Sequence, residues 1–393
     1  MSAGAVPRDA TVAVVGAGAM GCGIAQVASR AGHHVRLFDT RLGVAEKARA
    51  TIAQTLNGLA TKGKLDKGAA DAAASRIVAV HALGDCVSAQ LVIEAIIEDF
   101  AEKRSLLREL EKIVTPSTIL ASNTSSLSIT ALSAGLKFPN RVAGMHFFNP
   151  VPLMQLVEVV TGLATDAATA DSIAATAVDW GKQPVRATST PGFIVNRCAR
   201  PFYGEALRVL AERAADAATI DALLREAGGF RMGAFELMDL IGNDVNFAVT
   251  RSIWDACYHD PRYAPSVLQE ERVAAGYFGR KSGRGFFDYA DDAARPAPTT
   301  VSPQTAPKRL AVRGDLGVAR ALLERLAKAG VAVEPGGPRD EFPDGAIEVG
   351  DAVLALSDGR TATARAVTTG VRNLVLFDLA LDYAACTRVA MAR

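Results

Sequence analysis

The stretch RVAGMHFFNPVPLMQLVEVV, residues 141–160, holds two titratable side chains, His146 and Glu158, in a largely apolar run. In a hairpin whose turn is centred on Pro152, these two positions lie opposite each other, since each is six residues from the centre. Cross-strand neighbours on one face have Cβ atoms about 5 Å apart. A carboxylate at that distance can hold one imidazole nitrogen, which leaves the other free to exchange a proton with a substrate. The alternative is a core histidine satisfied by a chance carboxylate.

A glycine-rich turn is the second candidate site. The run GAGAMG, residues 16–21, follows a valine-rich stretch and opens a helix-like segment. In a β-α-β unit, the first glycine allows a tight turn, the second lets a pyrophosphate approach the backbone, and the third lets the helix pack on the strand. The phosphates then lie at the positive end of the helix. The pattern predicts dinucleotide binding by Gly16, Gly18, Ala19, Met20 and Gly21. The alternative is a glycine-rich turn that binds no ligand.

Asp39 lies 18 residues after Gly21, at the end of the next expected strand, where a carboxylate can accept hydrogen bonds from both ribose hydroxyls. Its charge would repel a 2′-phosphate, so the pattern favours NAD over NADP. Arg41 lies near Asp39 and could weaken this preference. A later turn, VRGDLG, lacks a glycine of the motif, and we interpret it as a structural remnant with nucleotide binding as the alternative.

A polar loop, SNTSSLSIT at residues 122–130, follows a buried strand. Ligands bind at the carboxyl ends of strands in such sheets. Ser125 and Asn123 could therefore donate hydrogen bonds to a substrate oxygen or to the nicotinamide ribose. The alternative is a loop that only caps a helix beginning near Ser128.

The elements that must position these residues alternate between strand and helix. Helical spacing is expected over 19–32, 41–78 and 101–113, and strands over 11–18, 34–39, 91–96, 118–122, 141–148 and 154–160. This alternation predicts a mostly parallel sheet, and hence an α/β Rossmann-type NAD-binding domain over residues 8–188.

The remainder of the chain divides into three further segments. An all-helical domain is expected over 189–290, followed by a Pro/Ala/Thr linker over 291–308 that has nothing to bury. Residues 309–393 are interpreted as a small C-terminal α/β Rossmann-like remnant. It begins as strand, helix and strand, continues as a hairpin over 346–366, and ends over 373–392 as a strand followed by a helix.

Composition excludes several classes of protein. The chain has 393 residues, is about half apolar and carries a net charge of +1, which suits a soluble globular protein and gives no reason to expect nucleic acid as a partner. The five cysteines are scattered without metal-binding spacing, so a reducing compartment and no metal site are expected. Residues 11–29 carry no charge, but their glycines favour strand, turn and helix over a membrane span. We therefore expect a cytoplasmic protein without a membrane partner.

Seven motifs along the chain resemble, in their order, those of the L-3-hydroxyacyl-CoA dehydrogenases, including the 3-hydroxybutyryl-CoA dehydrogenases. They cover about residues 8–290 and are GAGAMG, EAIIEDFAEK, ASNTSSLSIT, GMHFFNPVPLMQLVEVV, PGFIVNR, FELMDLIGNDV and GRKSGRGFFDY. The resemblance implies oxidation of the (S)-3-hydroxyl of an acyl-CoA by NAD, giving a 3-ketoacyl-CoA and NADH. It also implies coenzyme A as part of the substrate, and a homodimer formed through the helical domain.

Individual roles follow from the same resemblance. His146 would take the hydroxyl proton, Glu158 would orient His146, and Ser125 and Asn196 would hydrogen-bond the reacting oxygen or the histidine. Cofactor contacts are implied for Glu98, Lys103, Asn123, Asn149 and Lys281. Lys62 falls where the family binds coenzyme A phosphates, and Lys64 and Lys67 could assist it; a solvated helix face is the alternative. Substrate binding is thus assigned to Lys62, Ser125 and Asn196.

Two departures from the family pattern leave questions open. Arg231 and Ala234 stand where many relatives have proline, and Arg231 could meet an acyl terminus or the coenzyme, or be solvated. Residues 309–393 resemble the start of a longer extension, so the chain is either naturally short or a fragment. Two other functions stay open, a dehydrogenase of a free 3-hydroxy acid and a non-catalytic NAD-binding relative. Acyl chain length and pathway (fatty-acid, including β-oxidation, butanoate or aromatic degradation) also stay open, and a 3-hydroxyadipyl group would be compatible.

Overall fold

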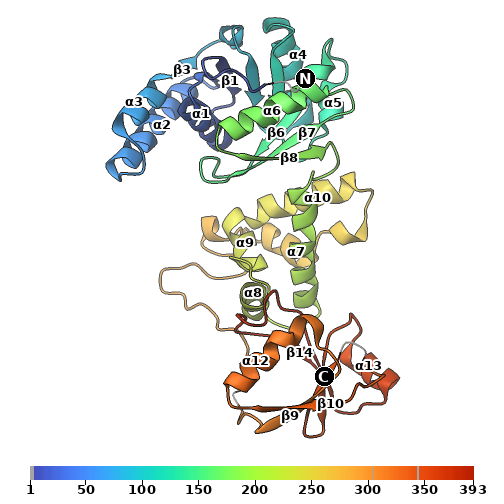
Figure 1. Cartoon of the computed structure of the whole chain (residues 1–393). Helices are drawn as coiled ribbons and strands as arrows, with labels where there is room; N and C mark the ends of the chain where they lie inside the picture. Colours follow the sequence, from blue (N-terminus) through green and yellow to red (C-terminus); the bar gives the residue numbers. More distant parts are fainter. Residues whose placement is uncertain (1–3, 303, 343–344) are drawn as a thin grey trace. The chain divides into compact units, whose positions relative to one another are not determined.

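The computed structural model describes residues 4–302, 304–342 and 345–393. The chain forms two compact units, Met1–Ala199 and Arg200–Arg393 (Figure 1). Within the described residues, the helices are all too short or too polar to cross a membrane.

The first unit is built on one sheet of eight strands in the order β3-β2-β1-β4-β5-β6-β7-β8. Neighbouring strands run parallel except β6 and β7, which are antiparallel. The chain crosses over at β1, which has β2 on one side and β4 on the other, and this is the switch point of a doubly wound sheet. The strands are β1 (Thr11–Val15), β2 (His34–Phe38), β3 (Ile77–Val80), β4 (Leu91–Glu94), β5 (Ile119–Ser122), β6 (Val142–Phe147), β7 (Leu156–Thr161) and β8 (Gln183–Thr188).

Helices cover both faces of this sheet. They are α1 (Ala19–Ala31), α2 (Val44–Thr61), α3 (Lys67–Ser75), α4 (Phe100–Ile113), α5 (Ile129–Ser133) and α6 (Ala167–Asp179). Side-chain caps begin several of them, since Asp66, Asp99 and Ser128 each accept a hydrogen bond from a backbone N–H in the first turn. Gly32 ends α1 in the left-handed conformation, as its position in the sequence predicts.

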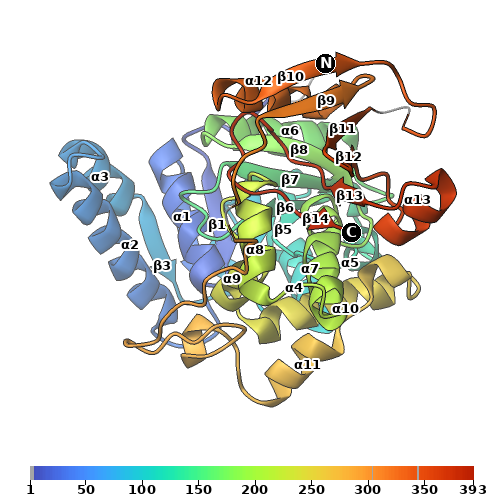
Figure 2. The same ribbon diagram turned by 90° about the horizontal axis from the view of Figure 1, so that it is seen from below.

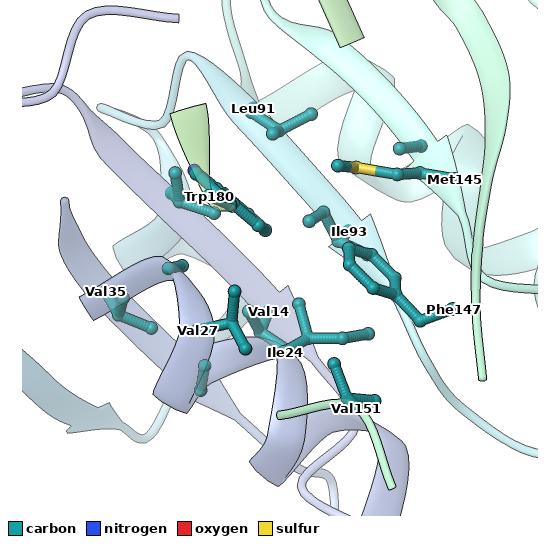
Figure 3. Close-up of a cluster of buried hydrophobic side chains, with 14 of the residues drawn as sticks. Val14, Ile24, Val27, Val35, Leu91, Ile93, Met145, Phe147, Val151 and Trp180 are labelled. Carbon is teal, nitrogen blue, oxygen red and sulfur yellow. The ribbon is translucent and has the colours of Figure 1, made fainter. Parts of the chain in front are cut away.

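The alternation of side chains along β1 explains why the strand is apolar throughout. Val12 and Val14 join the core cluster that contains α1, α2, α3 and α6 residues, whereas Ala13 and Val15 join the cluster that contains α4 and α5 residues. Figure 3 shows part of the first cluster, where Val14 of β1 lies among Ile24 of α1 and side chains of β4 and β6. A parallel strand buried on both faces reads as a continuous apolar run, which confirms the expected parallel sheet.

Some elements of the first unit were outside the predicted pattern. β3 overlaps the end of the stretch 41–78, which was expected to be helical, and continues beyond it. The sequence pattern did not predict α6 and β8. β3 and β8 are the edge strands, and QPVRAT in β8 is mostly exposed or half-buried, so hydrophobic periodicity is weak there.

The second unit begins with helices. α7 (Val195–Ala211) starts at the end of the first unit, and α8 (Ala217–Glu226), α9 (Ala234–Ile241), α10 (Asn243–Ala256) and α11 (Val267–Ala274) follow. The expected all-helical region is therefore confirmed. The linker that follows is held by polar contacts: the Thr299 N–H donates to Thr219 Oγ1 at 2.7 Å, and Arg295 pairs with Glu236 at 2.9 Å.

A second, six-stranded sheet follows in the order β10-β9-β11-β12-β13-β14, visible in Figure 2 together with its helices. Its elements are β9 (Arg309–Arg313), α12 (Ala321–Lys328), β10 (Ala332–Gly336), β11 (Ala346–Val349), β12 (Ala352–Leu356), α13 (Ala362–Thr369), β13 (Leu374–Phe377) and β14 (Met391–Ala392). The small α/β extension and the β11–β12 hairpin are confirmed.

Two details of the expected extension are wrong. Residues 362–369 form α13, so the hairpin ends before them, and Thr361 caps this helix by accepting from the Ala364 N–H. The segment after β13 forms turns and the short β14, where a helix was expected. Arg325 of α12 donates to the carbonyl oxygens of Tyr383 and Cys386, so tertiary contacts outweigh the helical propensity of this segment.

His33, between α1 and β2, gives a test of the first core. It is fully buried, and its ring packs edge-on against Trp180 at 5.6 Å. Burial holds the pKa of His33 below its ordinary value. The unfolded chain therefore binds a proton below about pH 6.5 that the folded chain refuses, and this costs stability as pH falls.

Replacing His33 with leucine, an apolar side chain of similar volume, should remove that cost. The free energy of unfolding of His33→Leu, minus that of the wild type, should therefore rise as pH falls from 7.5 to 5.5, measured by urea titration at each pH. A difference that stays constant over this range would show that His33 does not resist protonation.

Candidate functional site

The glycine turn connects β1 to α1 at the carboxyl edge of the first sheet. Gly16 has a φ of +103°, and a Cβ atom there would lie 2.5 Å from the carbonyl oxygen of Ala95. A Cβ atom at Gly21 would lie 1.7 Å from the Gly16 carbonyl oxygen, so neither position admits a side chain. Gly18 is exposed at the N-terminus of α1, and its Cβ position has no described atom within 4 Å. This open cradle fits the pyrophosphate of a dinucleotide.

Asp39 joins the glycine turn to the end of β2. Ala19 and Met20 form the first turn of α1, and just before them the Ala17 N–H donates to Asp39 Oδ2 at 2.9 Å. Arg41 donates to the same carboxylate through its backbone N–H, Nε and Nη2. Partial burial alone would raise the pKa of Asp39, but these donors hold it below its usual range. The carboxylate is therefore ionised and already bonded to protein groups.

His146 and Glu158 lie on adjacent antiparallel strands, β6 and β7, and the register pairs them directly, as the hairpin pattern predicts. His146 Nδ1 lies 2.6 Å from Glu158 Oε2, and both side chains are buried. Nε2 has no hydrogen-bond partner in the described parts of the chain. The rings of Phe148 and Phe193 lie 4.6 Å and 5.8 Å from the imidazole, so the pair sits in a largely apolar setting.

The second oxygen of Glu158 has a role that the sequence did not reveal. Oε1 accepts from the backbone N–H groups of Ile194 and Val195, both at 2.9 Å, where α7 begins. Burial would raise the pKa of Glu158, but the imidazole and these two amides lower it, so the group is held ionised. Asn196 follows directly, and its Nδ2 donates to the Ser125 carbonyl oxygen at 3.4 Å. One carboxylate thus joins the histidine to the segment that carries Asn196.

The serine loop after β5 is organised by Glu98. Its Oε1 accepts from the Ser125 N–H at 2.8 Å and from the Thr124 hydroxyl at 2.6 Å, with further donors from Ser126 and the Ser125 hydroxyl. Burial raises the pKa of Glu98, but the nearby Lys103 ammonium and these donors outweigh it and lower the pKa. Glu98 therefore fixes the backbone from which Ser125 projects.

A buried ionic network lies beside this loop. Lys103 Nζ is 2.5 Å from Glu94 Oε1 and 3.3 Å from Glu98 Oε2. The Ser122 hydroxyl donates to Glu94 Oε2 at 2.6 Å, and the Ile96 N–H donates to Oε1 at 2.8 Å. Neither Glu94 nor Ser122 was predicted as a site residue. The signal was present, because Glu94 is a lone acid in the buried strand LVIEAI, and buried charges need partners.

Two further contacts position the hairpin. Asn123 Oδ1 accepts from the Phe147 N–H at 2.9 Å, which ties the end of β5 beside His146. Lys182, which is buried, donates to the carbonyl oxygens of Val151 and Met154 and so holds the turn between β6 and β7. Asn149 lies exposed in this turn. Lys182 was missed because a single lysine after a helix looks like a surface residue.

Within the first unit, hydrogen bonds join His146 to Glu158 and Asn196 to Ser125, and Glu158 also binds the backbone amides just before Asn196. Lys62 and Lys64 are exposed near the end of α2, and Lys67 pairs with Asp71 on α3. Lys281 belongs to the second unit and pairs with Asp244 at 2.6 Å. In the ranges that the structure describes, no group of three or more His, Cys, Asp or Glu side chains could hold a metal ion.

Comparison with known families matches three segments of the chain. The NAD-binding domain of 3-hydroxyacyl-CoA dehydrogenase matches residues 11–190, and the C-terminal domain of the same family matches residues 192–289. A 3-hydroxybutyryl-CoA dehydrogenase reduced Rossmann-fold domain matches residues 354–393.

Individual relatives extend this similarity over nearly the whole chain. A protein of Escherichia coli (strain K12) named 3-hydroxyadipyl-CoA dehydrogenase is 42% identical, over 94% of this chain and 71% of its own. A crystal structure of 3-hydroxybutyryl-CoA dehydrogenase from E. coli K12 matches with a TM-score of 0.84 at 40% identity, over 98% of this chain and 74% of that one. The (S)-3-hydroxybutyryl-CoA dehydrogenase structure from Ralstonia eutropha matches with a TM-score of 0.69 at 40% identity, over 72% of this chain and 99% of that one.

The double use of Glu158 can be tested by comparing two substitutions. Glu158→Ala leaves the Ile194 and Val195 amides without their acceptor, whereas Glu158→Gln keeps an acceptor oxygen. An unsatisfied partly buried donor costs about 1–3 kcal/mol. We expect amide hydrogen exchange at Ile194 and Val195 to accelerate about tenfold or more in the alanine variant, and to change little in the glutamine variant. Equal exchange rates in both variants would contradict this role.

Proposed function

Because the chain belongs to the 3-hydroxyacyl-CoA dehydrogenase family, whose members oxidise 3-hydroxyacyl-CoA with NAD, we propose that His146 is its general acid and base. The enzyme is an NAD-dependent oxidoreductase with an acyl-CoA substrate. The observation that carries the proposal is the 2.6 Å contact between His146 Nδ1 and Glu158 Oε2, which leaves Nε2 available.

The proposed role follows from the charges. In oxidation, Nε2 of His146 accepts the proton of the 3-hydroxyl, and the ionised Glu158 stabilises the resulting imidazolium through Nδ1. Bound NAD supplies the acceptor for the hydride that leaves C3. In reduction, the imidazolium returns the proton to the 3-keto oxygen. The aromatic rings beside His146 exclude water and so strengthen the interaction with Glu158.

We propose that Ser125 and Asn196 hydrogen-bond the reacting oxygen or the histidine, since Asn196 donates to the Ser125 carbonyl oxygen and directly follows the two residues whose amides bind Glu158. Glu98, Lys103, Asn123, Asn149 and Lys281 are proposed to serve the cofactor, with Gly16, Gly18, Ala19, Met20, Gly21 and Asp39 at its phosphate and ribose end. Glu98 and Lys103 are also proposed to position other groups of the site, because Glu98 binds the serine loop and Lys103 pairs with Glu94.

We also propose the domain limits, the oligomeric state and the cellular location of the protein. The first two domain limits, 8–188 and 189–290, are supported by family matches that end at residues 190 and 289, whereas the linker over 291–308 and the extension over 309–393 follow from the sequence pattern. A homodimer through the helical domain is supported by Leu240, Ile241 and Val245, whose apolar side chains are 40–49% exposed around the end of α9 and the start of α10. A cytoplasmic location is proposed because NAD and acyl-CoA are intracellular metabolites.

The acyl group has two candidates. Similarity to a 3-hydroxybutyryl-CoA dehydrogenase favours a short acyl chain, and similarity over 94% of this chain to a 3-hydroxyadipyl-CoA dehydrogenase favours a dicarboxylic one. Following NADH oxidation with acetoacetyl-CoA, longer 3-ketoacyl-CoAs and 3-ketoadipyl-CoA would rank them. Activity on free acetoacetate without activity on any thioester would instead support a dehydrogenase of free 3-hydroxy acids.

Replacing His146 with glutamine tests the proposed function. Loss of a general acid–base group costs typically about 10² to 10⁴ in rate. We expect kcat for acetoacetyl-CoA reduction to fall by about that factor, while the Kd for NADH, measured by fluorescence titration, changes less than about threefold. A kcat within a few-fold of the wild type would remove His146 from the mechanism. Tight NADH binding by the wild type without turnover of any thioester would support a non-catalytic relative.

Lys62 tests the proposed coenzyme A contact. Lys62→Ala should raise the KM for acetoacetyl-CoA about five- to tenfold with little change in kcat, because a surface cation pairs with a phosphate far from the reacting carbon. Lys47→Ala is the matched control, since Lys47 is an exposed lysine in the first turn of the same helix, α2. Equal KM values for the two variants would leave Lys62 as part of a solvated helix face.

A further inference from the structure

The carboxylate of Asp39, at the end of β2, already accepts as many hydrogen bonds as it has lone-pair sites. Asp39 Oδ1 accepts from the backbone N–H and Nε of Arg41, both at 3.0 Å. Oδ2 accepts from the Ala17 N–H at 2.9 Å and from Arg41 Nη2 at 3.2 Å. A carboxylate offers about four lone-pair sites. Two are therefore held by backbone amides, and the other two, one on each oxygen, are held by the Arg41 guanidinium.

A ribose diol needs the positions that this guanidinium occupies. The 2′- and 3′-hydroxyls of an adenosine ribose would each donate one hydrogen bond to Asp39. The backbone amides belong to the glycine turn and to the chain after β2, so they cannot leave without moving the fold. The Arg41 side chain is 70% exposed and the Asp39 side chain 7% exposed, so the arginine lies over the carboxylate from the solvent side. Exposed ion pairs contribute little to stability, so this one can open.

We propose that Arg41 sets the choice between dinucleotides, by competing with the ribose diol of NAD(H) for Asp39 and by pairing with the 2′-phosphate of NADP(H). The inference rests on the proposed role of Asp39 at the cofactor ribose. A guanidinium fork matches phosphate oxygens as well as it matches a carboxylate. It also neutralises the charge of Asp39, which would otherwise repel the 2′-phosphate. The chain therefore binds NADPH measurably in addition to NADH.

This competition predicts opposite effects of one substitution. Without the guanidinium, Asp39 is free to receive the diol, so Arg41→Ala should lower the Kd for NADH, by up to about fivefold given the small strength of an exposed pair. The same substitution exposes the 2′-phosphate to an unpaired Asp39. The Kd for NADPH should therefore rise about tenfold or more, because the charge-assisted hydrogen bonds of the guanidinium to the phosphate are lost.

The experiment measures the Kd of NADH and of NADPH by fluorescence titration of the full chain, and kcat/KM for acetoacetyl-CoA reduction with each. Arg30→Ala is the matched control, because Arg30 is an exposed arginine in the last turn of α1, at the end far from the glycine turn. Its ratio of the two Kd values should equal that of the wild type. Asp39→Asn should weaken NADH binding and narrow the difference between the two dinucleotides.

The outcomes separate this inference from the proposed function. Opposite shifts for NADH and NADPH in Arg41→Ala, absent from Arg30→Ala, support it. If NADH binds and turns over but Arg41→Ala changes both Kd values by the same factor, Arg41 does not select the nucleotide and the inference is overturned alone. If Asp39→Asn leaves NADH binding unchanged, the proposed ribose contact fails and the inference falls with it.

Discussion

One buried carboxylate, that of Glu158, serves two elements of the structure at once, and the proposed chemistry depends on it. Glu158 gives one oxygen to the imidazole of His146 and the other to two backbone amides at the start of α7. A buried charge without hydrogen-bond partners would cost much free energy of folding. The imidazole and the two amides must therefore keep their positions around Glu158. The same contacts that hold Glu158 ionised also fix which nitrogen of His146 faces the carboxylate. Stability and the proposed chemistry therefore share one set of hydrogen bonds.

The carboxyl edge of the first sheet gathers other carboxylates in the same way. Glu98 collects the donors of the serine loop, Glu94 neutralises the buried Lys103, and Asp39 ties the glycine turn to the end of β2. Each acid lies near the end of a strand, where it accepts hydrogen bonds from backbone N–H groups of the following turn or of a neighbouring loop. The arrangement explains how loops of small polar residues keep one conformation beside a cofactor cradle: each is held by a carboxylate with several donors.

Much of this could be read from the sequence because it depends on local rules. The glycine turn, its helix and Asp39 follow from residue types at fixed spacing, and the facing of His146 and Glu158 follows from counting across a short turn. Edge strands such as β8 lack a hydrophobic period, so they could not be read. The partners of Glu98 and Glu158 come from segments 27 and 36 residues away, and no spacing rule reaches across such distances. The helix predicted after β13 was wrong for the same reason. Arg325, in a helix that is distant in the sequence, donates to a carbonyl oxygen of this segment and holds it in turns.

The most direct measurement is the pH dependence of kcat/KM for acetoacetyl-CoA reduction in the wild type and in Glu158→Gln. Reduction needs a protonated imidazole, so the rate falls as pH rises through the loss of that proton. In Glu158→Gln we expect this fall at lower pH, because an ionised carboxylate no longer stabilises the imidazolium. A falling limb at the same pH in both proteins, with the glutamine variant fully active, would contradict the claim that Glu158 acts through His146.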